Sequence, residues 1–162
     1  MRKIKFYSIS LLLICSCAKN NATDGGMSTR AVPTIYVQKS SESISFKNDT
    51  ILYANEKYSG YLYELNPENK DTISIEGFID GVQSGVSKKW YASNKLMEQR
   101  HYRYGKKNGK QIAYWENGNK KFDFTAINDA YEGELKEWNV EGKLIHLANY
   151  KNGQESGTQK LC

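Results

Sequence analysis

Hydrophobic and polar residues alternate in short runs along most of this chain. From residue 58 to residue 162 the runs are six to ten residues long and are bounded by Gly or Asn. Such runs are too short for typical helices, and they suit strands joined by tight turns. The pattern predicts an all-β protein built from β-hairpins.

Three sets of residues recur at a step of 24 or 25 positions, which indicates an internal repeat. The first set is Gly60, Gly85, Gly109, Gly133 and Gly157, followed five residues later by Leu65, Trp90, Tyr114, Trp138 and Cys162. The second is Gly81, Gly105, Asp129 and Gly153, preceded three residues earlier by Phe78, Tyr102, Ala126 and Tyr150. The third is Asn94, Gly118 and Gly142.

Each repeat is therefore predicted to be one β-hairpin whose turns carry the recurring Gly and Asn. Asn117-Gly118 is the strongest turn signal, because both central residues of a tight hairpin turn can need positive φ. A single hairpin is unstable alone, so successive hairpins must pack on one another. We expect an elongated antiparallel meander of stacked hairpins, forming an open sheet.

The recurring aromatic residues are the predicted core of the repeat. Trp90, Tyr114 and Trp138 should stack along one face, while Tyr102 and Tyr150 fall on the return strands. Each aromatic side chain can bury roughly 150–250 Å². The alternative is that these rings bind a ligand on an open face. The neighbouring Trp115 is out of register and is expected to be exposed.

The first residues form a predicted secretory signal, residues 1–16. Arg2, Lys3 and Lys5 precede an apolar run that is too short to span a bilayer. The sequence Ile14-Cys15-Ser16-Cys17 resembles the processing site of bacterial lipoproteins, which implies that Cys17 is acylated and becomes the anchored N-terminus. The residues after it lack an acidic pair, which favours the periplasmic side of the outer membrane; the cell surface is the alternative.

Three further segments follow from composition. Residues 17–33 contain the lipidated cysteine and a polar, flexible tether. Residues 34–57 form a degenerate hairpin that caps the repeats, with apolar runs at 44–46 and 51–53 around Lys47-Asn48-Asp49. Residues 58–162 are the repeats.

The net charge gives no support for nucleic-acid binding. The chain carries 23 basic and 18 acidic residues, a formal charge of +5. Three of the basic residues lie in the signal, which leaves +2 on the mature chain. A nucleic-acid surface needs concentrated basic charge.

Residues with catalytic or metal-binding potential are scattered. His101 and His146 lie 45 positions apart, and neither is near a cysteine. The sequence predicts a non-catalytic protein with no metal and no cofactor. By register Cys162 is a small buried residue in a truncated last unit; an intermolecular disulfide is the alternative in an oxidising compartment.

The repeat resembles the MORN-repeat variant of bacterial proteins. The resemblance covers Tyr58 to Cys162 and is carried by Trp90-Tyr91, Asn94, Tyr102, Gly105, Gly109, Tyr114-Trp115-Glu116-Asn117-Gly118, Trp138, Gly142, Tyr150, Gly153 and Gly157. It implies an open, twisted antiparallel sheet. Two departures, Asp129-Ala130 where Gly is expected and the longer loop NPENK at residues 66–70, put the regularity of the sheet in question there.

The resemblance also bears on function. Bacterial members are often labelled antitoxin components of toxin–antitoxin systems or lipoproteins of unknown role, and the wider class is linked to membrane association and protein binding. We expect a membrane-tethered module that binds a protein partner, with open sheet edges available for strand addition. An antitoxin or immunity protein is the alternative, and an envelope hydrolase is a third hypothesis.

Overall fold

The computed structural model describes residues 30–157 and 160–161. The predicted signal, Cys17, most of the tether and Cys162 lie outside the described residues. The strands are β1 (Tyr36–Gln38), β2 (Ile44–Lys47), β3 (Thr50–Tyr53), β4 (Glu56–Lys57), β5 (Gly60–Leu65), β6 (Thr72–Ile79), β7 (Val82–Gln83), β8 (Gly85–Trp90), β9 (Leu96–Arg103), β10 (Lys106–Tyr114), β11 (Lys120–Ile127), β12 (Ala130–Trp138), β13 (Leu144–Lys151), β14 (Gln154–Glu155) and β15 (Lys160–Leu161).

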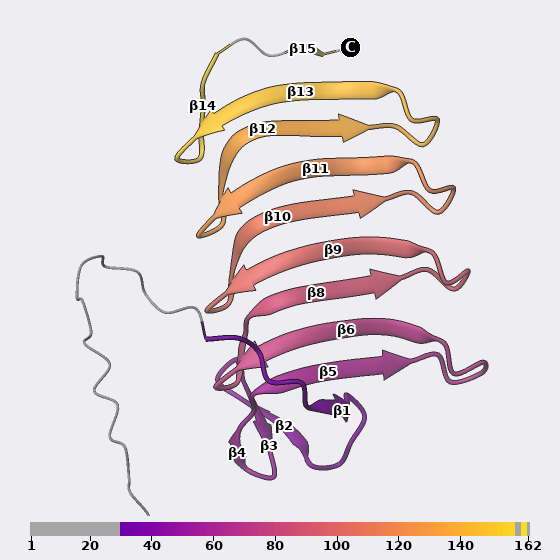
Figure 1. The fold of residues 1–162 in the computed structure, drawn as a ribbon, viewed down its shortest axis with the longest axis vertical. Helices are drawn as coiled ribbons and strands as arrows, with labels where there is room; N and C mark the ends of the chain where they lie inside the picture. Colours follow the sequence, from indigo (N-terminus) through magenta and orange to yellow (C-terminus); the bar gives the residue numbers. More distant parts are fainter. Residues whose placement is uncertain (1–29, 158–159, 162) are drawn as a thin grey trace, which may run out of the picture.

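One large open sheet holds twelve of these strands (Figure 1). Its order is β1-β5-β6-β8-β9-β10-β11-β12-β13-β14, with β7 paired to β6 and β15 paired to β13. Outgoing strands β5, β8, β10 and β12 alternate with return strands β6, β9, β11 and β13. The predicted all-β meander of hairpins is confirmed. The exception to antiparallel pairing is β1, which lies parallel to β5.

Five residues separate the outgoing strand from its return strand in the β8–β9, β10–β11 and β12–β13 hairpins. The first and fifth of them are hydrogen-bonded to each other, which leaves three residues in the loop itself. In the β10–β11 loop, Trp115 N donates to Asn119 O at 2.8 Å and Gly118 N donates to Trp115 O at 2.8 Å. Gly118 has a φ of 94°, whereas Asn117 does not have positive φ. The predicted hairpin turn at Asn117-Gly118 is present. Only Gly118 takes positive φ, because the loop has one residue more than a two-residue turn.

Two-residue turns with positive φ at both positions join each return strand to the next repeat. They are Asp80-Gly81, Tyr104-Gly105, Asn128-Asp129 and Asn152-Gly153. Asp129 stands where the other repeats have glycine and adopts a φ of 71°. Its carboxylate accepts a hydrogen bond from Lys107 N at 2.8 Å, and pairing continues directly through Ile127 and Ala130. The Asp129 departure leaves the sheet regular.

All of the glycines predicted to lie in turns have positive φ. They are Gly85, Gly105, Gly109, Gly118, Gly133, Gly142, Gly153 and Gly157. Gly109 and Gly133 lie inside β10 and β12, beside shifts in pairing register with the preceding return strand. These positions are bulges, where glycine removes the steric cost of the left-handed backbone. The NPENK loop likewise leaves β5 and β6 paired from Gly60 to Leu65.

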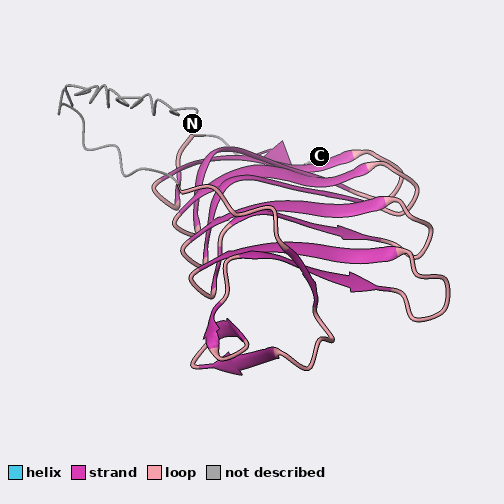
Figure 2. Cartoon of the chain, turned by 60° about the horizontal axis from the view of Figure 1, so that its bottom comes forward, coloured by secondary structure: helices cyan, strands magenta, loops and turns pink. Residues whose placement is uncertain are grey.

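The N-terminal cap is a separate three-stranded sheet, β2-β3-β4. The predicted hairpin around Asn48-Asp49 is present, and both of these residues have positive φ. The cap packs on the first repeat through the cluster Ile51, Tyr58, Leu62 and Phe78. The cap sheet and the curved strands of the large sheet are seen together in Figure 2.

Arg30 and Val32, in the last part of the predicted tether, contact the large sheet. Arg30 Nη1 donates to both carboxylate oxygens of Asp80, at 2.9 and 3.1 Å. The Val32 side chain lies over Gly77 and Gly85, where an added Cβ would come within 3.3 and 2.6 Å of it. The absence of side chains at these glycines makes room for the segment.

The two faces of the large sheet differ in character. The register places all of the following on one face, here called the buried face: Leu62, Ser74, Phe78, Ser87, Gln111, Ala113, Phe124, Ala126, Leu135 and Ala148. Many of these side chains are short, and longer neighbours on adjacent strands close over them. The opposite face is called the aromatic face, because it carries Trp90, Tyr114 and Trp138.

Candidate binding face

A row of aromatic residues runs along one margin of the aromatic face. Trp90, Tyr114 and Trp138 are the last residues of β8, β10 and β12, so they lie at the arrowheads of these strands in Figure 1. We call these three residues the aromatic row. All three are half-buried. Leu65, the last residue of β5, occupies the same position in the first repeat.

The row is not the core that the sequence predicted. Neighbouring strands lie 4.7–4.9 Å apart, so residues two strands apart are separated by about 9.4–9.8 Å. Rings at that separation cannot stack on each other directly. The intervening return strands place Leu96 opposite Trp90 and Lys120 opposite Tyr114. The two remaining predicted core residues are Tyr102 and Tyr150. They lie on return strands, as predicted, and on the buried face, where each is half-buried.

The residue after each of the first two members of the row forms a bond between repeats. Tyr91 Oη donates to Tyr114 O at 2.9 Å, and Trp115 Nε1 donates to Trp138 O at 3.0 Å. Trp115 is half-buried, so its predicted exposure was wrong. Trp115 lies one repeat after Tyr91, and this spacing is the sequence signal for the pair of bonds.

The polar hydrogens of the aromatic row form no hydrogen bond within the described chain. Neither the indole N–H groups of Trp90 and Trp138 nor the hydroxyl of Tyr114 donates to another described residue, unlike the adjacent Tyr91 and Trp115. Tyr and Trp normally find a partner for this group when buried, and they are favoured at interfaces for the same reason. Two repeats, at Trp90-Tyr91 and Tyr114-Trp115, thus pair a half-buried ring of the row with a neighbouring ring that bonds to the next repeat.

Shallow hollows flank the row. One of about 320 Å³ is lined by Asp71, Thr72, Ile75, Trp90 and Asn94. A second, of about 360 Å³, includes Trp138 together with the charged side chains of β10, β11 and β12. The row therefore has space and polar groups beside its rings.

The charged hollow is held together by ion pairs around Asp123. Lys110 and Lys120 both pair with its carboxylate. Burial acts to raise the pKa of Asp123, but the hydrogen bonds and charges of the two lysines outweigh it, and the pKa lies below its usual value. Lys120 Nζ also lies 5.6 Å from the centre of the Trp138 ring. The Lys120 ammonium group thus lies between the Asp123 carboxylate and one ring of the row.

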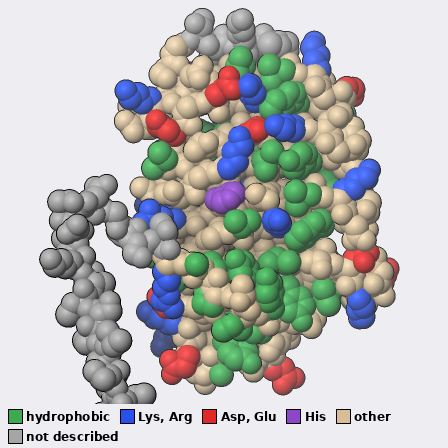
Figure 3. Space-filling view, viewed as in Figure 1, with side chains coloured by type: hydrophobic (Ala, Val, Ile, Leu, Met, Phe, Trp, Pro, Cys, Tyr) green, Lys and Arg blue, Asp and Glu red, His purple; other side chains and the backbone are tan. Residues whose placement is uncertain are grey.

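An apolar area continues the aromatic face toward the N-terminal cap. Tyr36 and Tyr61 stack with ring centres 5.2 Å apart, and with Ile75 and Val86 they line a hollow of about 260 Å³. Tyr36 is 55% exposed. Figure 3 shows hydrophobic side chains gathered over β5, β6 and β8. This end of the sheet is more apolar than the end near β12 and β13.

The buried face carries a polar network that serves the fold. Glu98 pairs with Arg100 at 3.0 Å and with Lys89 at 3.4 Å. Burial acts to raise the pKa of Glu98, but the hydrogen bond and charge of Arg100, with Lys89, lower it overall. The Arg100 guanidinium lies 4.4 Å from the centre of the Phe122 ring. The network closes over the short side chains beneath it.

Gln111 is a structural residue that the sequence did not single out. It is fully buried, and its Nε2 donates to His101 O at 2.9 Å and to Gly109 O at 3.2 Å. These bonds satisfy carbonyl groups at the β9–β10 bulge, where the ladder is interrupted. A polar residue does not add to the hydrophobic pattern of a strand, so that pattern does not predict the burial of Gln111.

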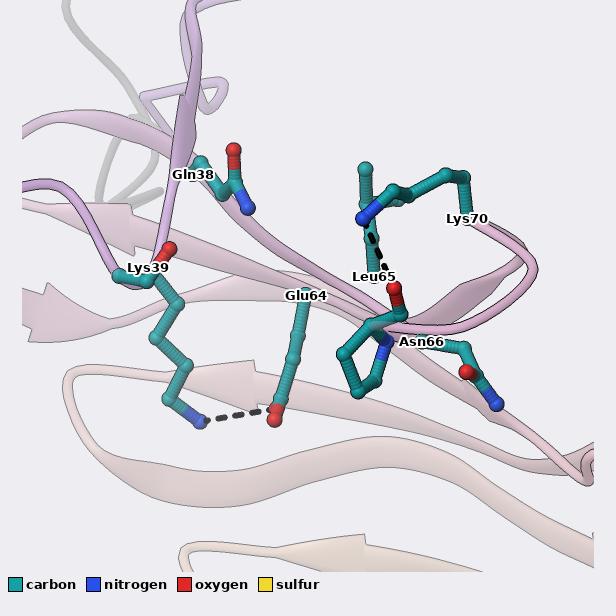
Figure 4. Close-up of a pocket in the computed structure, with 8 residues that line it drawn as sticks. Gln38, Lys39, Glu64, Leu65, Asn66 and Lys70 are labelled. Atoms are coloured by element: carbon teal, nitrogen blue, oxygen red, sulfur yellow. Dashed lines mark hydrogen bonds and ion pairs between the residues drawn. The ribbon is translucent and has the colours of Figure 1, made fainter.

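A further hollow, of about 600 Å³, lies between the end of β1 and the β5–β6 loop (Figure 4). Lys39 Nζ lies 3.9 Å from Glu64 and 3.7 Å from Glu76, and Lys70 Nζ donates to Pro67 O at 2.8 Å. Lys39 is thus paired with two carboxylates, and Lys70 with a backbone carbonyl. The hollow touches the aromatic row only through its neighbour Leu65.

Neither histidine is placed for metal binding. His101 Nδ1 lies 2.7 Å from Lys110 O and must donate to it, while His146 Nδ1 bonds to Glu137 at 3.0 Å. Within residues 30–157 and 160–161, no group of three or more His, Cys, Asp and Glu side chains could hold a metal ion.

The sheet edges are less open than the sequence suggested. At one end β1 pairs with Tyr61, Leu62 and Tyr63 of β5. At the other, β14 pairs with Tyr150 and Lys151, and β15 pairs with His146 and Leu147. The chain itself thus pairs with part of the backbone of β5 and β13, and the short strands β1 and β14 stand at the ends of the strand order.

Comparison with known protein families, with curated proteins and with solved structures found no match. In the part of the chain that the structure describes, no helix is long and apolar enough to cross a bilayer.

Proposed function

We propose that this protein is a lipid-anchored, non-catalytic repeat module that binds another protein in the bacterial cell envelope through its aromatic face. The lipoprotein-like sequence ending at Cys17 supports the anchor and the location. One observation carries the binding role: Trp90, Tyr114 and Trp138 form a regular, half-buried row whose ring donors have no partner among residues 30–157 and 160–161. Half-buried Trp and Tyr with free donors are typical of protein interfaces.

The test is a crosslinking pull-down of C-terminally tagged protein from native membranes. The wild type is compared with Cys17→Ala, which removes the proposed lipid anchor, and with Trp90→Ala, which removes one ring of the row. Trp115→Phe is the matched control, since Trp115 is a neighbouring ring whose indole bonds within the fold.

The proposal predicts a partner that is lost with Trp90→Ala and kept with Trp115→Phe. A partner that depends on Cys17 as well would show that the anchor is needed for the encounter. Equal capture by all variants, or no capture from membranes, would contradict binding through this face. A toxic gene product among the captured proteins would instead favour the antitoxin alternative.

A further inference from the structure

The aromatic row has a fixed period that restricts what kind of polypeptide can lie along it. Its members are the last residues of alternate strands, so each step equals two strand spacings, about 9.4–9.8 Å. In Figure 1 the strands β8, β10 and β12 run nearly parallel, with their arrowheads one above another. A segment running along the row, across the strands, meets an equivalent ring at each step.

The common backbone conformations differ in how well they match this step. Side chains on one face of an extended strand repeat about every 6.6–6.8 Å. One α-helical turn advances 5.4 Å, so two turns give about 10.8 Å. A polyproline II helix has three residues per turn and a rise of 3.1 Å, so every third residue returns to the same edge after about 9.3 Å. Polyproline II matches the row most closely.

The chemistry of the row fits the same conformation. A polyproline II backbone has no internal hydrogen bonds, so its carbonyl groups are free to accept. The rings of Trp90, Tyr114 and Trp138 carry donors that the described chain leaves unused. Proline-rich segments are commonly bound in grooves lined by aromatic residues, because the ordered helix loses little entropy on binding. The hollows beside Trp90 and Trp138 leave room for the residues between the prolines.

We propose that the aromatic row binds a proline-rich segment of the partner in the polyproline II conformation, with one turn of the segment on each repeat. The inference rests on the proposed function and names the class of partner. A proline at every third position packs on successive rings, and ring N–H and O–H groups donate to the intervening carbonyls.

The test measures binding of fluorescent peptides to the full chain in detergent micelles by anisotropy. One peptide has proline at every third position, and the other has the same composition with the prolines adjacent. The periodic peptide should bind about tenfold more tightly, because it alone places a ring contact on each repeat. Tyr114→Phe should weaken its binding by about three- to tenfold, the range for loss of one hydrogen bond. Trp115→Phe should leave binding unchanged.

Equal affinity for the two peptides, no binding of either, or binding that Tyr114→Phe leaves unchanged would overturn the proposal. The pull-down separates this failure from failure of the proposed function. A partner captured from membranes through Trp90, but without affinity of the protein for proline peptides, would keep the binding role and reject polyproline II recognition.

Discussion

At the scale of single residues, Tyr114 and Trp115 show how one repeat divides its aromatic side chains between fold and surface. Trp115 donates its indole N–H to the carbonyl of Trp138 in the next repeat. Tyr114 accepts the equivalent bond from Tyr91 at its backbone, while its own hydroxyl has no partner in the described chain. Adjacent rings of similar size therefore have separable roles.

This division predicts that substitutions at Trp115 and Tyr114 differ in their effect on the free energy of unfolding. Trp115→Phe removes a half-buried hydrogen bond between repeats and should lower the free energy of unfolding by about 0.5–1.5 kcal/mol. Tyr114→Phe removes only an unpaired hydroxyl and should leave stability unchanged. Urea denaturation followed by circular dichroism measures both. A larger loss for Tyr114→Phe would mean that its hydroxyl has a partner within the fold.

Substitutions at Gly118 measure the cost of a left-handed backbone conformation without a change in side-chain packing. It has a φ of 94°, and an added Cβ would meet nothing within 4 Å. Gly118→Ala should therefore cost only the left-handed backbone penalty, about 1–2 kcal/mol. Gly118→Asn should cost less, because Asn94 holds the same loop position with a φ of 61°. Equal thermal denaturation midpoints for the two variants would contradict the shared loop geometry.

At the scale of elements, the joint between the cap sheet and the first repeat lies at Gly81. Ile51 N donates to Gly81 O at 2.9 Å, and Gly81 N donates to Tyr58 O at 2.7 Å. An added Cβ at Gly81 would lie 2.3 Å from the Thr50 methyl group and 2.6 Å from the Ile51 carbonyl oxygen. The β6–β7 turn and strand β3 are thus in direct backbone contact.

Gly81→Ala should therefore destabilise the protein more than Gly118→Ala, although both residues have positive φ. The Gly81 side chain would have to displace a backbone carbonyl, so a loss above about 2 kcal/mol is expected, beyond the backbone penalty alone. Hydrogen exchange should show faster exchange of the Ile51 amide in this variant. Equal stability of the two variants would show that the cap is not fixed at this joint.

The sequence predicted the hairpins better than it predicted the two faces. Glycine, asparagine and aspartate mark the turns because few other residues adopt positive φ, so their spacing locates each hairpin. The buried face has no comparable signal. Ala113, Ala126 and Ala148 are covered by longer side chains from neighbouring strands, which a single strand's pattern does not reveal. The aromatic pattern therefore predicts a core at the row, although the row lies on the opposite face.

At the scale of the whole molecule, two carboxylates that each form ion pairs with basic residues make the free energy of unfolding depend on pH. The pKa values of Glu98 and Asp123 both lie below their usual values, because paired Arg and Lys residues outweigh the effect of burial. In the unfolded chain these groups titrate near pH 4.3 and 3.9. Their stabilisation is complete above about pH 5 and is lost as the pH falls through the lower folded-state values.

The free energy of unfolding should thus fall as the pH drops from about 5 toward 2. Glu98→Gln and Asp123→Asn should be less stable at neutral pH and should show a flatter acid dependence. Glu141→Gln, at an exposed loop residue, is the control and should follow the wild type. An unchanged acid slope in both variants would mean that other groups control acid unfolding.

The most direct measurement of the central claim is photocrosslinking in living cells. The photoreactive amino acid p-benzoylphenylalanine replaces Tyr114 on the aromatic row or Tyr131, which contacts Phe124 and Tyr150 of the buried face. Tyr131 is 38% exposed, whereas Tyr114 is half-buried, so random collisions should favour Tyr131. The account predicts a discrete adduct with one protein from position 114 and none from position 131. Adducts from position 131 alone, or from neither position, would contradict binding through the aromatic face.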